Sequence, residues 1–195
     1  VYKRQVYEAC VKLRQDLDSR PWQPGEERRA EYYYACDPCF AIGDFEGAKK
    51  RGAKYRNFPA YAYATQAAIV EVDRETGEVR LLKVIAAHDV GRAINPHIIE
   101  GQMHGSCSMG QGYALTEGYP TENGYPVKTL YRQLGLPRAE DTPDYEIILI
   151  EDPEPQGPFG AKGISEVATV PVTPAILNAV SRATVSYTHL RAHET

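Results

Sequence analysis

A glycine-rich run that ends in a carboxylate is the first feature of this sequence that could carry chemistry. It reads Gly-Pro-Phe-Gly-Ala-Lys-Gly-Ile-Ser-Glu over residues 157–166. Its glycines allow positive φ and close approach of the backbone to a ligand. Glu166 falls where a helix is predicted to begin, at Val167 or soon after. It is therefore either an acid that stabilises a helix start or a general base in a glycine-lined pocket, where removal from water favours proton uptake. The residues alone favour the first interpretation.

A second glycine-rich segment covers residues 101–112 and contains four glycines within a predicted helix. Each glycine costs a helix about 1 kcal/mol relative to alanine, so something must offset it. One offset is close helix packing through Gly101 and Gly105, which are four residues apart. The other is close approach of a phosphate or a cofactor, to which Gln102 and Gln111 would offer amide hydrogen bonds.

The cysteines form no recognisable metal or redox motif. Cys36 and Cys39 make a single CxxC pair, whereas a structural zinc site needs four ligands. A thioredoxin-like pair would need a βα context, but this one follows a tyrosine run. We interpret the pair as incidental thiols and Cys107, among small residues, as a helix-packing residue.

The histidines at positions 88, 97 and 104 lack metal-ligand spacing. We therefore expect no side-chain metal ligand and interpret these histidines as structural. His88, beside Asp89, is the most interesting of the three.

The elements that must position these residues alternate between helix and strand. We predict helices over 6–18, 96–116 (capped by Asn95) and 173–183 (capped by Thr173), strands over 67–72, 79–86 and 145–151, and a turn over 73–78 that makes a hairpin. Residues 44–60 and 152–163 are predicted as loops. This pattern predicts an α+β fold with a mixed sheet and packed helices.

Composition excludes several classes of protein. The chain has 195 residues, 43% hydrophobic and 25% charged, with a formal net charge of −4. This charge argues against nucleic-acid binding, and the lack of a long apolar run argues against a membrane span. Four cysteines are too few for a disulfide scaffold, which favours a reducing, cytoplasmic compartment.

The two ends look foreign to the protein. Residues 1–5, written as GTG TAT AAG AGA CAG, have the reverse complement CTGTCTCTTATACAC. Read from its third base, this encodes Val-Ser-Tyr-Thr, the residues found at 185–188. We therefore expect tails of translated sequencing adapter at 1–5 and 185–195, and a native fragment over 6–184.

Three segments together resemble the xanthine dehydrogenase (molybdenum hydroxylase) family. They are His88–Pro96, Glu100–Gly105 and Gly160–Glu166. The resemblance is to the C-terminal part of the molybdopterin-binding large subunit, spans most of 6–184, and is clearest over 62–184. It makes the helix-start interpretation of Glu166 the weaker one.

The resemblance implies a molybdenum-molybdopterin cofactor, plain or in its cytosine dinucleotide form. The pterin dithiolene holds the metal, so no side chain need ligate it. Glu166 matches the glutamate that acts as general base toward the water-derived nucleophile. The implied cofactor-binding residues are Gly101 and Gln102, against the pterin, and Gly163, Ile164 and Ser165, in the pocket wall.

The resemblance also implies hydroxylation of an N-heterocycle, purine- or xanthine-like, with water as the oxygen source. Electrons would leave through 2Fe-2S clusters to FAD on partner domains or subunits, in an oligomer of heteromers. Many members have Gly-Val-Gly-Glu where this chain has Gly163-Ile164-Ser165-Glu166, which leaves the substrate class open. The alternatives are an aldehyde oxidoreductase of the same family and a non-catalytic subunit-interface domain, and we expect the isolated fragment to be inactive.

Overall fold

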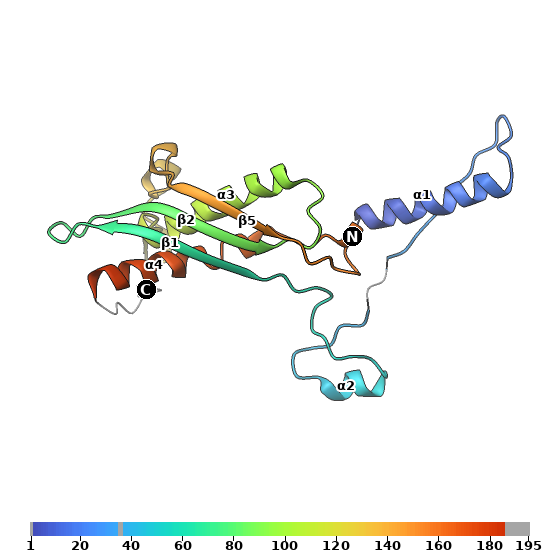
Figure 1. Cartoon of the computed structure of the whole chain (residues 1–195), viewed down its shortest axis with the longest axis horizontal. Coiled ribbons are helices and arrows are strands. Elements are labelled where there is room, and N and C mark those ends of the chain that lie inside the picture. The colour runs from blue at the N-terminus through green and yellow to red at the C-terminus, as the bar shows by residue number, and fades with distance from the viewer. Residues whose placement is uncertain (1, 35–36, 186–195) are drawn as a thin grey trace. The chain divides into compact units, whose positions relative to one another are not determined.

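The computed structural model describes residues 2–34 and 37–185. The chain divides into two compact units (Figure 1). The first unit comprises residues 1–61 and 152–162, and the second comprises residues 62–151 and 163–195. The second unit contains every residue that the sequence nominates for catalysis or cofactor binding.

A three-stranded mixed sheet forms the centre of the second unit. Its strands are β1 (Ala64–Val72), β2 (Val79–Asp89) and β5 (Asp144–Ile150), in the order β1-β2-β5. β1 pairs with β2 antiparallel, and β5 pairs with β2 parallel. The predicted hairpin, the predicted third strand and the α+β class are therefore confirmed.

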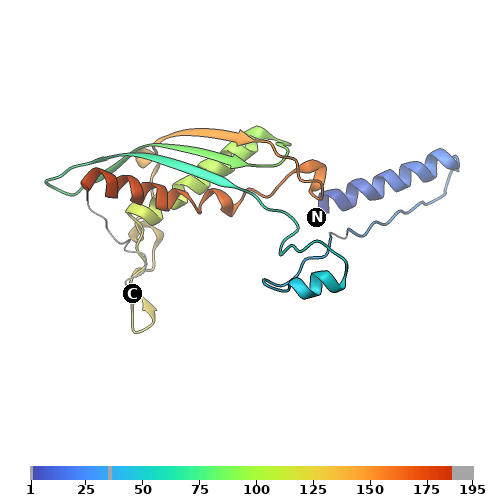
Figure 2. The same cartoon turned by 60° about the horizontal axis from the view of Figure 1, so that its bottom comes forward.

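Helices α3 (Pro96–Leu115) and α4 (Val172–Thr184) cover one face of this sheet (Figure 2). α3 begins as predicted, because Asn95 Oδ1 accepts a hydrogen bond from the Ile98 amide at 3.2 Å. The predicted Thr173 cap is wrong. Thr173 lies inside α4, and its hydroxyl donates to the Gly110 carbonyl at 2.9 Å, which joins α4 to α3.

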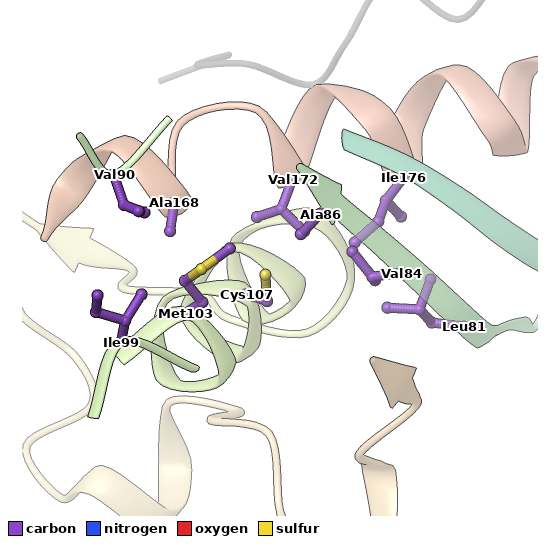
Figure 3. Close-up of a cluster of buried hydrophobic side chains, with 10 residues drawn as sticks. All are labelled: Leu81, Val84, Ala86, Val90, Ile99, Met103, Cys107, Ala168, Val172 and Ile176. Atoms are coloured by element: carbon purple, nitrogen blue, oxygen red, sulfur yellow. The ribbon is translucent and has the colours of Figure 1, made fainter. Parts of the chain in front are cut away.

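The core lies between the sheet and the two helices (Figure 3). Alternate residues of β2 point into it, as expected for a strand with one covered face. Its fully buried members include Val84, Ala86, Met103, Cys107, Ala168, Val172 and Ile176. The prediction that Cys107 is a packing residue is confirmed, and burial raises its pKa to about 11.

Short elements complete the second unit. β3 (Thr121–Glu122) and β4 (Tyr125–Pro126) form a small hairpin, followed by 3₁₀ turns η1 (Tyr131–Gln133) and η2 (Ala139–Asp141). A further 3₁₀ turn, η4 (Glu166–Ala168), precedes α4. A helical turn therefore begins at Glu166, close to the predicted start at Val167.

The first unit contains α1 (Tyr2–Ser19), α2 (Phe45–Lys50) and the 3₁₀ turn η3 (Pro158–Gly160). α1 includes the predicted helix and also runs through residues 2–5, which we expect from the sequence to be foreign. α2 was predicted as loop, because six residues are too few to show an apolar period; Asp44 caps it by accepting from the Gly47 amide at 2.8 Å. Cys36 of the CxxC pair lies outside the described residues. No described helix is both long and apolar enough to cross a membrane.

The glycine that permits close helix packing is Gly110. A Cβ on Gly110 would overlap Val172 Cγ1 and lie 3.2 Å from the Thr169 carbonyl oxygen. Gly101 and Gly105 have nothing within 4 Å of a built Cβ. The expectation that Gly101 and Gly105 pack against another helix is therefore wrong within this unit.

Gly110→Ala is expected to lower the free energy of unfolding by about 1–3 kcal/mol, because buried Val172 is β-branched and cannot move aside. Gly105→Ala is the matched control, and it should raise stability by about 1 kcal/mol through helix propensity alone. Denaturant unfolding of both variants checks this. Equal effects at the two positions would contradict the assigned helix contact.

Candidate active site around Glu166

Glu166 is the first residue of η4. The amides of Thr169 and Val170 donate to its carbonyl at 3.0 and 3.3 Å, which closes the turn. The side chain is exposed and makes no hydrogen bond or ion pair with any residue in 2–34 or 37–185. The expected enclosure of Glu166 in a deep pocket is therefore absent from this unit, because the segment that carries it lies on the surface.

The segment before Glu166 is fixed to α3. Ser106 Oγ donates to the Ser165 carbonyl at 3.1 Å, and Ser106 is fully buried. Ile164 packs against the core, whereas Gly163 has nothing within 4 Å of a built Cβ. The segment 163–166 therefore has one side against the core and one side open to solvent, where Ser165 and Glu166 are exposed.

Gln102 lies on the same face of α3 as Ser106. Residues four apart on a helix stand about 5–6 Å apart at Cβ, so Gln102 is one turn from the residue that holds the Ser165 carbonyl. Its carboxamide is exposed and makes no hydrogen bond within the described part of the chain. The structure therefore brings Gln102 and the Glu166 segment to the same region of the unit.

These residues fit a flat, polar-edged pterin. Gly101 and Gly105 offer open backbone, and the Gln102 amide offers both a donor and an acceptor. Gln111 does not take part, contrary to expectation, because it is buried and its Nε2 donates to the Asp141 carbonyl at 2.8 Å. Among residues 2–34 and 37–185, no three His, Cys, Asp or Glu side chains gather as a metal site. A metal that arrives on its own organic ligand requires no such group.

The comparison with known families decides the identity. The sequence pattern of the molybdopterin cofactor-binding domain matches residues 6–143, which is more than half of the chain. The chain belongs to the molybdenum hydroxylase family. The α+β molybdopterin-binding domain expected from the sequence is confirmed by the same findings.

Curated relatives in this family are much longer than the chain. Probable hypoxanthine oxidase XdhD of Escherichia coli (strain K12) is 36% identical over 123 residues, which cover 62% of this chain and 13% of the relative. The aldehyde oxidoreductase molybdenum-binding subunit PaoC of Escherichia coli O157:H7 is 31% identical over 192 residues, 92% of this chain and 26% of the relative.

Solved structures agree on the fold. Quinoline 2-oxidoreductase from Pseudomonas putida 86 superposes with a TM-score of 0.61 at 35% identity, and the match covers 64% of this chain and 16% of that one. A Cu,Mo-CO dehydrogenase superposes with a TM-score of 0.60 at 31% identity, covering 65% of this chain and 16% of that one. The molybdenum hydroxylase fold therefore extends over about two thirds of the chain.

Gln66 and His88 form a buried polar pair behind η4, and only His88 was singled out from the sequence. Gln66 Nε2 lies 2.9 Å from His88 Nε2 and donates to the Ala168 carbonyl at 2.8 Å. His88 is only 1% exposed. A signal was present, since Gln66 shares the inward face of β1 with Ala68 and Val70, where a polar residue is unusual.

The hydrogen-bond geometry fixes the state of this pair. A carbonyl only accepts, so the Gln66 atom beside Ala168 is the amide nitrogen. Its second hydrogen points to His88 Nε2, which must then be the acceptor, with the imidazole proton on Nδ1. His88 is therefore neutral, in agreement with burial, which lowers its pKa.

Burial of Gln66 and His88 costs free energy. Gln66 Oε1 and His88 Nδ1 have no hydrogen-bond partner among the described residues. A buried polar atom without a partner costs about 1–3 kcal/mol. Two apolar side chains would avoid this cost, so the pair does not serve packing alone.

Lowering the pH should destabilise the fold through His88. Its folded pKa lies below the ordinary value of 6.5, so the unfolded chain binds the proton more readily. The free energy of unfolding that depends on neutral His88 is fully present above pH 6.5. It is lost as the pH falls from 6.5 toward the folded pKa, because the unfolded chain takes up the proton first. Unfolding free energies measured across this range check it.

His88→Gln is the control for this pH dependence, because it keeps an acceptor and does not titrate. Its unfolding free energy should fall less than that of the parent protein over the same pH range. The same loss of stability in both proteins would contradict the assignment to His88.

Proposed function

We propose that this chain is the C-terminal molybdopterin-binding portion of an oxidoreductase that hydroxylates an N-heterocycle of the purine or xanthine type. The oxygen comes from water, and Glu166 is the general base. The observation that carries this proposal is the joint placement of Glu166 and Gln102. The Ser106–Ser165 hydrogen bond holds η4 against α3, one turn from the Gln102 amide.

Each nominated residue has a role that its surroundings support. The bound cofactor supplies the metal that activates water and accepts electrons from the substrate. The Glu166 carboxylate, which has no partner within the described residues, is available to take the proton of the attacking oxygen. Gln102 binds a polar edge of the pterin, and Gly101 leaves room for it.

The wall residues Gly163, Ile164 and Ser165 line the approach to the base. Ile164 anchors the wall in the core, and Gly163 leaves open space on its Cβ side. The exposed Ser165 hydroxyl is a hydrogen-bond donor and acceptor beside Glu166. A polar group at this position suits the ring nitrogens of a heterocycle.

Relatives support a heterocyclic substrate without excluding others. Their names include a probable hypoxanthine oxidase, a probable xanthine dehydrogenase subunit and a nicotine 6-hydroxylase large subunit. Aldehyde oxidation is the second candidate, because the aldehyde oxidoreductase subunit matches 92% of this chain. A non-catalytic interface domain is the third, and the availability of Glu166 and Gln102 argues against it.

The remaining parts of the enzyme are proposed by the same reasoning. Several relatives are named as subunits or large chains, which supports a heteromeric assembly with partner subunits. We further propose that these partners carry 2Fe-2S clusters and FAD and that the assembly is cytoplasmic. The cofactor would be molybdopterin, plain or in its cytosine dinucleotide form. Within the chain, residues 6–184 would be the native domain and 1–5 and 185–195 the foreign tails.

Turnover in ¹⁸O-labelled water tests the proposal. The complete subunit, assembled with its redox partners, should convert a purine such as hypoxanthine to a product that carries ¹⁸O. A parallel reaction with benzaldehyde tests the second candidate. Label in neither product would contradict a hydroxylase. The 195-residue chain alone should turn over neither substrate, because Glu166 is exposed to solvent in it.

A further inference from the structure

We propose that Gln66 and His88 are positioning residues for Glu166. Gln66 holds the far end of η4 through the Ala168 carbonyl, and His88 holds Gln66. This inference rests on the function proposed above, because it concerns the geometry of the same general base.

The turn η4 is held at both ends by hydrogen bonds to its backbone. On its N-terminal side, the Ser165 carbonyl accepts from Ser106 of α3 at 3.1 Å. On its C-terminal side, the Ala168 carbonyl accepts from Gln66 of β1 at 2.8 Å. Glu166 lies between these two hydrogen bonds. With the carbonyls of Ser165 and Ala168 both fixed, the backbone that carries the Glu166 side chain has little freedom to move.

Ala168 is the buried end of the turn. Ala168 is fully buried in the core, whereas Glu166 is exposed. Figure 3 shows Ala168 among the core side chains, with its ribbon leading into α4. Any shift of the Ala168 carbonyl is therefore passed along two residues to the exposed carboxylate.

Gln66 needs a second contact to keep its place beside Ala168. A glutamine side chain has several rotamers, and without another partner its amide could swing away from the Ala168 carbonyl. The pairing of β1 with β2 sets Gln66 opposite Ala86, and His88 is its diagonal neighbour. His88 Nε2, 2.9 Å from Gln66 Nε2, accepts the second amide hydrogen and so holds the amide in the rotamer that donates to Ala168.

The cost of the arrangement supports a positioning role. Gln66 Oε1 and His88 Nδ1 are both buried without a partner in the described part of the chain. A packing role would be met better by two apolar side chains, like the neighbouring Ala68 and Val70. Among the described residues, the shortest hydrogen bond that the pair makes outside itself is to Ala168, in the turn that carries Glu166, and Gln66 Nε2 also lies 3.8 Å from Cys107 Sγ.

Amide hydrogen exchange tests the proposal without reference to activity. The Thr169 and Val170 amides close η4 on the Glu166 carbonyl, so their exchange reports the turn directly. In the complete enzyme, Gln66→Met should speed their exchange about 5- to 10-fold, because it removes one hydrogen bond. His88→Leu should do the same through misorientation of Gln66, whereas His88→Gln, which keeps an acceptor, should restore slow exchange.

Kinetics provide the second measurement. Misplacing a base by a fraction of an ångström to about 1 Å should lower kcat about 10- to 100-fold. KM and molybdenum content should stay within about twofold, since neither residue reaches the surface that binds them. Ile176→Val, a buried change in α4 away from η4, is the matched control for general loosening of the core.

The outcomes separate this proposal from the proposed function. Unchanged exchange at Thr169 and Val170 in both Gln66→Met and His88→Leu would overturn the positioning role, even if Glu166→Gln is inactive. Equal effects in Ile176→Val would overturn it too. Faster exchange in Gln66→Met and His88→Leu, together with full activity of Glu166→Gln, would support the contact that fixes η4 but would exclude Glu166 as the base. If Gln66→Met does not fold, His88→Leu against His88→Gln decides.

Discussion

Glu166→Gln is expected to lower turnover of the complete enzyme by at least about 100-fold. Glutamine has nearly the same shape as glutamate but cannot take up a proton at neutral pH. The exposed side chain makes no hydrogen bond or ion pair with the described residues, so its replacement removes no contact that holds the fold. Molybdenum and pterin content should therefore stay near the parent values, and the loss should appear in kcat.

Glu122→Gln is the matched control for this change. Glu122 is also an exposed carboxylate of the second unit, in β3, on a hairpin separate from η4. Its replacement should leave kcat within about twofold of the parent, as is usual for surface changes away from a site. Full activity of Glu166→Gln, with normal cofactor content, would remove Glu166 from the mechanism.

Gly101→Phe is expected to reduce bound molybdopterin about tenfold or more. The side chain would project from α3 beside Gln102, into space where, apart from the adjoining residues and backbone of the helix itself, no atom of the described residues lies within 4 Å of a built Cβ. The protein should therefore fold, and the ring would obstruct the pterin instead. An obstruction of 1–3 kcal/mol, ordinary for an overfilled contact, is about 5- to 150-fold in affinity.

Gly118→Phe distinguishes obstruction from the general effect of adding a ring. Gly118 also has nothing within 4 Å of a built Cβ, and it lies beyond the end of α3. The helical stretch from Gly101 to the end of α3 at Leu115 alone spans roughly 21 Å. Molybdenum measured by plasma mass spectrometry should fall in Gly101→Phe alone. An equal loss in both variants, or in neither, would contradict the placement of the pterin on this face.

Local signals were sufficient for most of the fold. Asn95-Pro96 predicted the start of α3, and the Asp73–Glu78 turn predicted the hairpin, because capping and turn preferences act within a few residues. Strand alternation and helical periodicity identified β1, β2, β5, α1 and α4 to within a few residues. α2 was missed, since a helix of six residues shows less than two turns of periodicity.

Contacts between distant segments could not be predicted in the same way. Thr173 was expected to cap α4, but it donates to Gly110 on a different helix. The close approach of α3 to α4 uses Gly110 rather than Gly101 and Gly105. In each case the choice depends on how two helices cross, which no local pattern encodes.

The residues of the candidate site could be predicted from the sequence, but the residues that hold them in place could not. Glu166 and Gln102 were named from motifs, and the structure brings their segments together through Ser106 and Ser165. Gln66 was overlooked because its partner His88 is 22 residues away in the sequence. Their contact depends on the register between β1 and β2, and that register shifts at a bulge between Ile69 and Val70. Exposure of Glu166 was also not foreseen, because burial depends on everything that surrounds a residue.

Anomalous diffraction at the molybdenum edge, from crystals of the loaded enzyme, tests the central claim most directly. We predict one strong peak next to the Glu166 carboxylate, with pterin density along α3 at Gln102 and Gly101. A molybdenum peak on another face of the domain, with Glu166 and Gln102 in contact only with protein, would contradict it.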